Sequence, residues 1–146
     1  MYYQSLASEL IRIRMNLLQV PASQKLSGIL RGELFVLNYL YNRDEGVHPK
    51  ELSEKLSVST ARIASLLNHM EEKHLVVRET DLQDSRQVLV RLTPDGLDAI
   101  RRCRSDVLAN VERMLEGLGP DDAREYIRIQ EKIYNNYMNS GKKNYG

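Results

Sequence analysis

The chain has 146 residues, 42% of them hydrophobic and 28% charged, a balance typical of one soluble globular domain with a real core. No apolar run approaches the roughly 18 to 20 residues of a membrane-spanning helix, and the N-terminal segment lacks a secretory pattern, so we expect no membrane partner. The one cysteine, Cys103, fits a reducing compartment, and we expect a cytoplasmic location. The net charge of +1 excludes the large basic excess of many nucleic-acid-binding domains.

The N-terminal third predicts two helices. The first extends from about residue 4 to 20 and is ended by Pro21. The segment PASQKLSG, residues 21–28, is expected to be a polar connector. The second helix, about Ile29 to Asn42, is apolar around nearly its whole circumference, which predicts a central core helix. Gly46 marks its exit, as a candidate for a left-handed turn. The apolar stripe of the first helix consists of Leu6, Leu10, Ile13 and Leu17.

Residues 48–73 predict two short helices joined by a tight turn. Pro49 suits the first position of the earlier helix, residues 57–59 form the turn, and Ser59 is a good N-cap for a helix from Thr60 to about Lys73. The inward side of this second helix consists of Ile63, Leu66, Leu67 and Met70. The outward side consists of Ser59, Thr60, Ala61, Arg62, Ser65, Asn68 and His69.

A hairpin follows. A strand begins at Leu75, and the alternation of Val88, Val90 and Leu92 with polar residues predicts its half-buried partner. The loop between them, TDLQDSRQ, is too long for a two-residue turn and should project. At its tip lie Asp84, Ser85 and Arg86. Asp and Ser are common in plain turns, but Asp84 is also close enough in sequence to orient the Arg86 guanidinium.

The C-terminal third predicts two more helices. Thr93 and Pro94 suit the N-cap and first position of a long helix, and residues 119–122 interrupt it before a last helix that continues to about residue 139. We expect the tail SGKKNYG to be disordered. The apolar stripe of the long helix consists of Ile100, Cys103, Val107, Val111, Met114 and Leu118.

The order helix, turn, helix, strand, loop, strand is that of a winged helix-turn-helix, whose second helix can lie in the DNA major groove. In this context the chain resembles the multiple-antibiotic-resistance regulator (MarR) family over nearly its whole length. The most specific resemblance is Asp81-x-x-Asp84-x-Arg86 in the wing, followed by Leu92-Thr93-x-x-Gly96.

The resemblance implies a mainly α fold with a small β-hairpin wing (α+β). A single MarR-like domain of residues 1–146 would contain a winged lobe at about 47–93 and dimerisation helices at about 4–20 and 94–139. It further implies a bacterial homodimer that binds a palindromic double-stranded DNA operator, usually as a repressor. The recognition helix would enter the major groove and the wing arginine the minor groove, and a small lipophilic or phenolic effector would bind between the lobe and the dimer helices.

Three positions depart from the usual pattern of the family. His74 replaces a glycine after the recognition helix, and histidine tolerates the left-handed conformation better than most residues. His48 stands where serine or threonine is common. Ser65 lies where an arginine is often found, so the operator preference does not carry over.

Other functions have weaker support. Arg62 on an isolated helix would be an ordinary surface arginine, but in a winged helix it favours DNA contact. The histidines and Cys103 lack the spacing of a compact metal site, Cys103 suits a buried small hydrophobe, and no catalytic or cofactor-binding constellation is visible. The near-neutral charge keeps a rival function open, namely a winged-helix protein-interaction module without DNA binding. The tyrosines could line a ligand pocket or pack in the core; they are Tyr2, Tyr3, Tyr39, Tyr41, Tyr126, Tyr134 and Tyr137.

Overall fold

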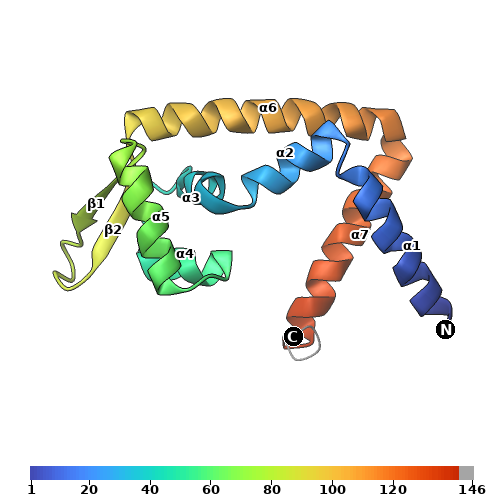
Figure 1. Cartoon of the computed structure of the whole chain (residues 1–146), viewed down its shortest axis with the longest axis horizontal. Coiled ribbons are helices and arrows are strands. Elements are labelled where there is room, and N and C mark those ends of the chain that lie inside the picture. Colours follow the sequence, from blue (N-terminus) through green and yellow to red (C-terminus); the bar gives the residue numbers. More distant parts are fainter. Residues whose placement is uncertain (142–146) are drawn as a thin grey trace.

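The computed structural model describes residues 1–141, which form seven helices and one two-stranded antiparallel hairpin. Long helix α6 runs the length of the molecule, with the winged lobe at one end and the terminal helices at the other (Figure 1). None of the helices in these residues has the length and apolar composition that crossing a membrane requires. The elements are α1 (Tyr2–Leu17), α2 (Pro21–Ile29), α3 (Gly32–Leu40), α4 (Pro49–Leu56), α5 (Thr60–Glu72), β1 (Val76–Thr80), β2 (Val88–Leu92), α6 (Pro94–Leu118) and α7 (Pro120–Asn139).

One hydrophobic core holds the lobe together. Its fully buried side chains come from α3, α4, α5, both strands and the first half of α6. Because Ile100 of α6 is 0% exposed within this core, the start of α6 is part of the lobe, although the same helix continues to the opposite end of the molecule. The largest fully buried side chains are Leu52, Ile63, Leu67, Met70, Ile100, Val36, Val76 and Val90.

The hairpin pairs Val76 with Leu92 and Thr80 with Val88. A third segment joins its edge: Val47, in the loop before α4, exchanges two backbone hydrogen bonds with Val90, at 3.0 and 2.8 Å. The start of the helix-turn-helix is therefore fixed directly to the second strand of the wing.

Left-handed residues make the tight connections of the lobe. Gly46 has φ 85°, as predicted, and Ser57 ends α4 with φ 57°. His74 has φ 61°, a left-handed conformation that histidine tolerates better than most residues other than glycine. Leu75 N–H donates to the Met70 carbonyl at 3.0 Å, and this bond turns the chain from α5 into β1.

The expectation that residues 21–28 form a polar connector is wrong, because they form most of α2. Pro21 occupies the first helical position, where its missing N–H costs nothing. Ala22 and Ile29 lie about two helical turns apart, on the same side of α2, and both are buried against α6. The true connections are short: α1 ends at Leu17 rather than near residue 20, and α3 begins at Gly32, whose φ of 57° suits glycine, rather than at Ile29.

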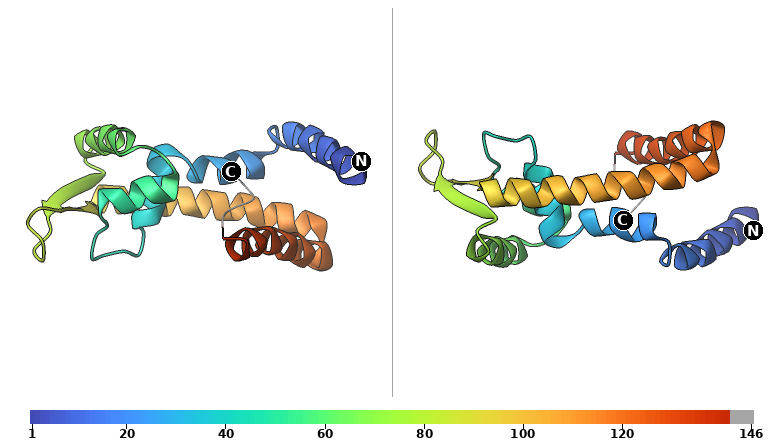
Figure 2. Two further views of the ribbon diagram at one scale, coloured as in Figure 1. Left: turned by 90° about the horizontal axis from the view of Figure 1, so that it is seen from below. Right: turned by 90° about the horizontal axis from the view of Figure 1, so that it is seen from above.

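The terminal helices are largely uncovered. They extend away from α6 at the end opposite the lobe and lie on different sides of its axis (Figure 2). All of α1 is exposed, and neither α1 nor α7 contains a buried residue. The predicted apolar stripe of α1 is real but faces open space in the single chain. Most of the tail that we expect to be disordered, residues 142–146, lies outside the described residues.

Candidate nucleic-acid interface

The predicted helix-turn-helix is formed by α4 and α5. Pro49 takes the first position of α4, and Ser59 caps α5 by accepting a hydrogen bond from the Arg62 N–H at 3.1 Å. Val58 N–H donates to the Ser53 carbonyl at 3.1 Å, which closes the turn. The predicted first helical position of Pro49 and the predicted N-cap role of Ser59 are both confirmed. Together these contacts fix the direction in which the first turn of α5 leaves the lobe.

The start of α5 presents a polar, exposed face. Ile63, Leu67 and Met70 are buried as predicted, and this orientation leaves the predicted outward side chains in solvent. Within residues 1–141 the Arg62 side chain makes no hydrogen bond or ion pair, so its guanidinium is available to an external acceptor. The exposed residues of this face are Ser59, Thr60, Ala61, Arg62, Ser65, Asn68 and His69.

The second half of this face is partly engaged within the protein. Arg78 of β1 donates to the Asn68 side-chain oxygen at 2.7 Å and to the Glu71 carboxylate at 2.9 Å. The Arg78 hydrogen bond lowers the pKa of Glu71. His69 lies 3.9 Å from the Glu72 carboxylate. Asn68 thus keeps its amide N–H groups for other partners, whereas Arg78 is neutralised by a carboxylate.

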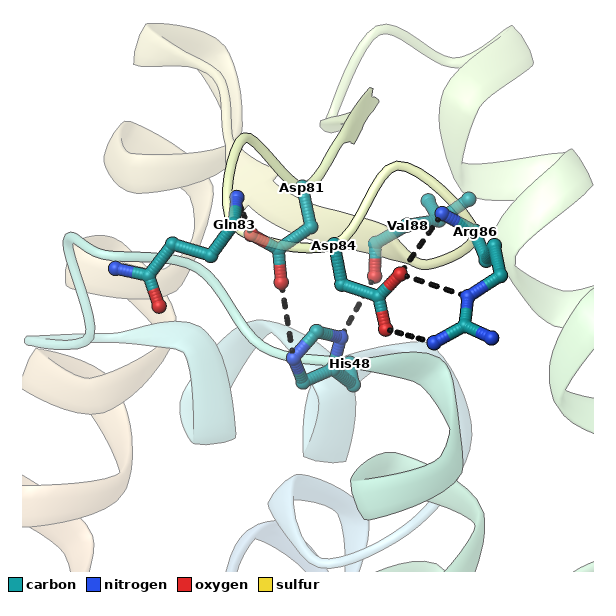
Figure 3. A network of polar contacts seen from close by, with 6 residues as sticks. All are labelled: His48, Asp81, Gln83, Asp84, Arg86 and Val88. Atoms are coloured by element: carbon teal, nitrogen blue, oxygen red, sulfur yellow. Dashed lines mark hydrogen bonds and ion pairs between the residues drawn. The ribbon is translucent and has the colours of Figure 1, made fainter.

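The wing carries an ion pair at its tip (Figure 3). Asp84 Oδ1 accepts from the backbone N–H and from Nε of Arg86, both at 3.1 Å. The Arg86 side chain is nevertheless 88% exposed, so the carboxylate orients the guanidinium without covering it. Hydrogen bonding from the Arg86 side chain, aided by its backbone N–H, lowers the pKa of Asp84. The pair therefore persists through neutral pH and is lost only as the pH falls through that lowered pKa.

Two backbone hydrogen bonds close the wing loop. Asp81 N–H donates to the Gln87 carbonyl at 2.9 Å, and Gln87 N–H donates to the Asp84 carbonyl at 3.0 Å. The Asp81 side chain accepts from the Gln83 N–H at 2.9 Å. These bonds make the first aspartate of the sequence motif a brace for the loop, while the second orients the arginine. Ser85, between Asp84 and Arg86, is exposed at the tip of the loop.

His48 contacts the wing, a role that the sequence did not reveal. Its ring Nε2 lies 3.4 Å from Asp81 Oδ2, and its Nδ1 lies 3.1 Å from the Val88 carbonyl oxygen (Figure 3). From the sequence, His48 is noted only as a departure from the serine or threonine that is common at this position in the family that the chain resembles. It is the N-cap of α4 by position, but its side chain makes no capping bond. No local signal identifies this contact, because its partners, Asp81 and Val88, lie 33 and 40 residues later in the chain.

The second part of the motif docks α6 onto the lobe. Thr93 caps α6 by accepting from the Gly96 N–H at 3.0 Å, and its hydroxyl donates to the His74 carbonyl at 2.5 Å. Thr93 N–H also donates to the Leu75 carbonyl at 3.1 Å. A Cβ on Gly96 would lie 2.0 Å from that same carbonyl oxygen. Glycine is therefore required where α6 passes over the segment that follows α5.

Two hollows adjoin α6. One of about 520 Å³ lies between the lobe and the start of α6 and includes Tyr41 and Arg101 in its wall. The other, of about 810 Å³, lies between α6 and α7 and is lined mainly by apolar side chains such as Leu108 and Leu115. Of the predicted tyrosines, Tyr39 instead stacks on Phe35 under Arg43. Cys103 is half-buried and packs against the lobe core.

Comparisons with known proteins agree with this geometry. A family described as a winged helix DNA-binding domain matches residues 33–111. The HTH-type transcriptional regulator YdgJ of Bacillus subtilis is 28% identical over 113 residues, which cover 77% of this chain and 68% of YdgJ. A putative transcriptional regulatory protein for the hcr operon of Thauera aromatica is 25% identical over 107 residues, covering 73% of this chain. This chain spans 64% of the Thauera protein, slightly less than two thirds of its length.

Among solved structures, the MepR–DNA complex of S. aureus superposes with a TM-score of 0.66 at 22% identity, over 88% of this chain and 96% of that one. At this identity the likeness concerns the fold, and it extends beyond the lobe to most of both chains. The residues matched by the family include the whole helix-turn-helix and the wing. The fold shared with the MepR–DNA complex agrees with the predicted resemblance to the MarR-type regulators. The chain belongs to the winged helix DNA-binding family.

Proposed function

We propose that this protein is a homodimeric, sequence-specific DNA-binding transcription regulator that represses transcription from a palindromic operator and responds to a small ligand. The observation that carries the proposal is the Asp84–Arg86 pair, in which a wing arginine is oriented by a carboxylate yet remains 88% exposed. A guanidinium held in this way suits a narrow, electronegative minor groove.

The exposed start of α5 supplies the second DNA contact in this proposal. Its short side chains, such as Thr60 and Ser65, allow a close approach of backbone to DNA. Arg62, with no partner among the described residues, can donate to guanine or to a phosphate. Since a recognition helix contacts bases chiefly through its N-terminal residues, Arg62 is better placed for base readout than Asn68 and His69, which lie further along the helix.

The proposed dimer forms through the helices that the lobe leaves uncovered. In α1 the side chain of Leu10 is 57% exposed, and in α7 that of Ile133 is 56% exposed. Apolar stripes on helices from both ends of the chain, splayed on different sides of α6 (Figure 2), match the needs of a second copy, which two-fold symmetry provides by default. The two α5 helices would then lie about one DNA turn, roughly 34 Å, apart.

The ligand in this proposal is a small lipophilic or phenolic molecule, as the MarR resemblance implies. The apolar hollow between α6 and α7 suits such a molecule better than the hollow beside Arg101, whose wall is more polar. A ligand changes DNA affinity only if it binds one lobe spacing better than another. Both hollows adjoin α6, the one element shared by the lobe and the dimer helices.

The near-neutral net charge leaves open the rival function of a protein-interaction module without DNA binding, so the decisive test is DNA binding itself. In a gel-shift assay, full-length protein should retard a duplex from upstream of its own gene much more strongly than a shuffled duplex of equal length and composition. The assay is repeated with a panel of small phenols to test ligand response. Equal or absent retardation of the two duplexes would refute operator recognition, and release by none of the phenols would refute the proposed ligand class.

A further inference from the structure

We propose that Arg78 is a positioning residue for DNA binding, because it holds the side-chain amide of Asn68 as a hydrogen-bond donor to a phosphate of the operator backbone. Asn68 would thus orient α5 on the duplex without reading a base. The DNA contact rests on the proposed function, whereas the hold of Arg78 on the amide can be tested without DNA.

One guanidinium joins strand β1 to two neighbouring side chains of α5. Arg78 Nη2 donates to Asn68 Oδ1 at 2.7 Å, and Arg78 Nε donates to the Glu71 carboxylate at 2.9 Å. Asn68 and Glu71 are three residues apart and therefore adjacent on the helix surface. Because the donors of a planar guanidinium point in fixed directions, the bond to Glu71 also sets the direction of the bond to Asn68.

The orientation of the Asn68 amide follows from this contact. Arginine donates hydrogen bonds and accepts none, so the amide oxygen, rather than the amide nitrogen, must face Arg78. The nitrogen Nδ2 is turned away from Arg78, and it donates to no acceptor within residues 1–141. Asparagine pairs with adenine by donating and accepting at once. With its oxygen engaged by Arg78, Asn68 instead offers two donors, which suit a group that only accepts.

The place of Asn68 on α5 favours a phosphate as that acceptor. Ala61, Ser65 and Asn68 are spaced by four and three residues, so they lie along one side of α5, and all three are exposed. Asn68 is six residues beyond Arg62, which is about 9 Å along the helix. The major groove is only about 12 Å wide. When Arg62 contacts a base, Asn68 therefore lies toward the edge of the groove, where phosphate oxygens are the acceptors.

The charges around the amide are compatible with an anion. The Glu71 carboxylate is neutralised by Arg78, whose hydrogen bond lowers the pKa of Glu71, so the pair persists at neutral pH. The other carboxylate nearby belongs to Glu72, whose side chain is 76% exposed and lies 3.9 Å from His69, so it is not held against the amide. The cationic guanidinium also polarises the amide that it holds, which strengthens the outward N–H donors.

The first experiment measures the mobility of the Asn68 side chain by NMR in the free, full-length protein. The heteronuclear NOE of Asn68 Nδ2 should be large in wild type and small in Arg78→Ala, which lacks the bond to the amide. Arg91→Ala is the matched control and should leave this NOE unchanged. Arg91 also pairs with a carboxylate, that of Glu79 at 3.0 Å, but the strand register places it on the opposite face of the hairpin from Arg78. Equal mobility of the amide in wild type and Arg78→Ala would overturn the positioning role.

The second experiment measures operator binding by fluorescence anisotropy across a salt series. Asn68→Ala should weaken binding by the dimer roughly ten- to hundredfold, because one hydrogen bond to a charged group is lost in each half-site. The slope of log K against log salt concentration should stay unchanged, because asparagine neutralises no phosphate. Arg78→Lys keeps the charge but loses the fork of donors. It should weaken binding roughly three- to thirtyfold, because the freed amides must be immobilised again on DNA, whereas Arg91→Lys should bind as wild type does.

A double variant separates positioning from direct contact. In the Asn68→Ala background, Arg78→Lys should have no further effect, because the group that it positions is absent. A full effect in that background, or wild-type affinity of Arg78→Lys alone, would overturn the role of Arg78. A loss by Asn68→Ala that is confined to one base pair, and absent on random DNA, would overturn the phosphate assignment in favour of a base edge. Absence of DNA binding by wild type would refute the proposed function and the phosphate contact with it, while the NMR measurement would still decide how the amide is held.

Discussion

Replacement of Gly96 by alanine tests how α6 is joined to the lobe. Gly96 is buried in the first turn of α6, and its Cα lies so close to the residue before β1 that an added Cβ would be 2.0 Å from the Leu75 carbonyl oxygen. Real Cβ atoms essentially never approach another atom closer than 3.0 Å, and the obstacle here is backbone rather than the end of a flexible side chain. Either α6 or the start of β1 must therefore move.

The expected magnitude follows from what that movement disturbs. Overpacking of a buried site costs about 1 to 3 kcal/mol. The same shift strains the Thr93 bonds to Leu75 and His74, each worth about 0.5 to 1.5 kcal/mol. Alanine returns about 0.5 to 1 kcal/mol because it is the better helix former. We therefore expect Gly96→Ala to lower the free energy of unfolding by about 2 to 4 kcal/mol.

The same helix offers a matched control. A Cβ added to Gly117, near the other end of α6, meets nothing within 4 Å, so Gly117→Ala should raise the free energy of unfolding by about 0.5 to 1 kcal/mol. Urea unfolding followed by circular dichroism, at one protomer concentration, compares both variants with wild type. If Gly96→Ala proves as stable as Gly117→Ala, α6 does not pack on Leu75 as described.

Three further predictions concern DNA binding and assembly. Arg62→Ala should weaken operator binding by about 1 to 3 kcal/mol and relax the preference at one base pair per half-site; in anisotropy titrations, an equal loss on random DNA would make Arg62 a phosphate contact instead. Arg86→Ala should reduce the slope of log K for operator binding against log salt concentration by about 2 for the dimer, since each lost phosphate neutralisation contributes about 0.9. Asp84→Asn should also weaken operator binding, although it makes the protein more positive. Tighter binding by Asp84→Asn, together with unchanged binding by Arg86→Ala, would exclude the wing from the interface. Light scattering should show that the wild-type protein is a dimer at micromolar concentration. Leu10→Glu or Ile133→Glu should make it monomeric, whereas the control Leu82→Glu, at a fully exposed wing position, should leave it dimeric. A monomeric wild-type protein would refute the proposed dimer.

Local chemistry made several elements predictable. Ser59 and Thr93 each cap a helix through a side-chain oxygen that accepts a hydrogen bond from a backbone N–H in the first turn. Because this N–H lies only two or three residues later in the chain, the contact can be predicted without knowledge of the tertiary fold. Asp84 orients Arg86 for the same reason, since only two residues separate them. In α2, by contrast, Pro21 has two local meanings, the end of one helix or the first turn of the next. The burial of Ala22 and Ile29 against α6 selects the second.

Helix α5, the N-caps of α5 and α6, the projecting wing and the ion pair at its tip are predictable from the sequence, because helical periodicity, capping and short-range pairing each depend on residues a few positions apart. The packing of the whole fold was needed to distinguish the arginines around the hairpin: Arg78 is neutralised by Glu71 and Arg91 by Glu79, whereas Arg86 stays exposed. It alone brought His48 to Asp81 across 33 positions of the chain. These outcomes depend on strand register and on how the helices pack, and those are set by the whole core rather than by any one segment.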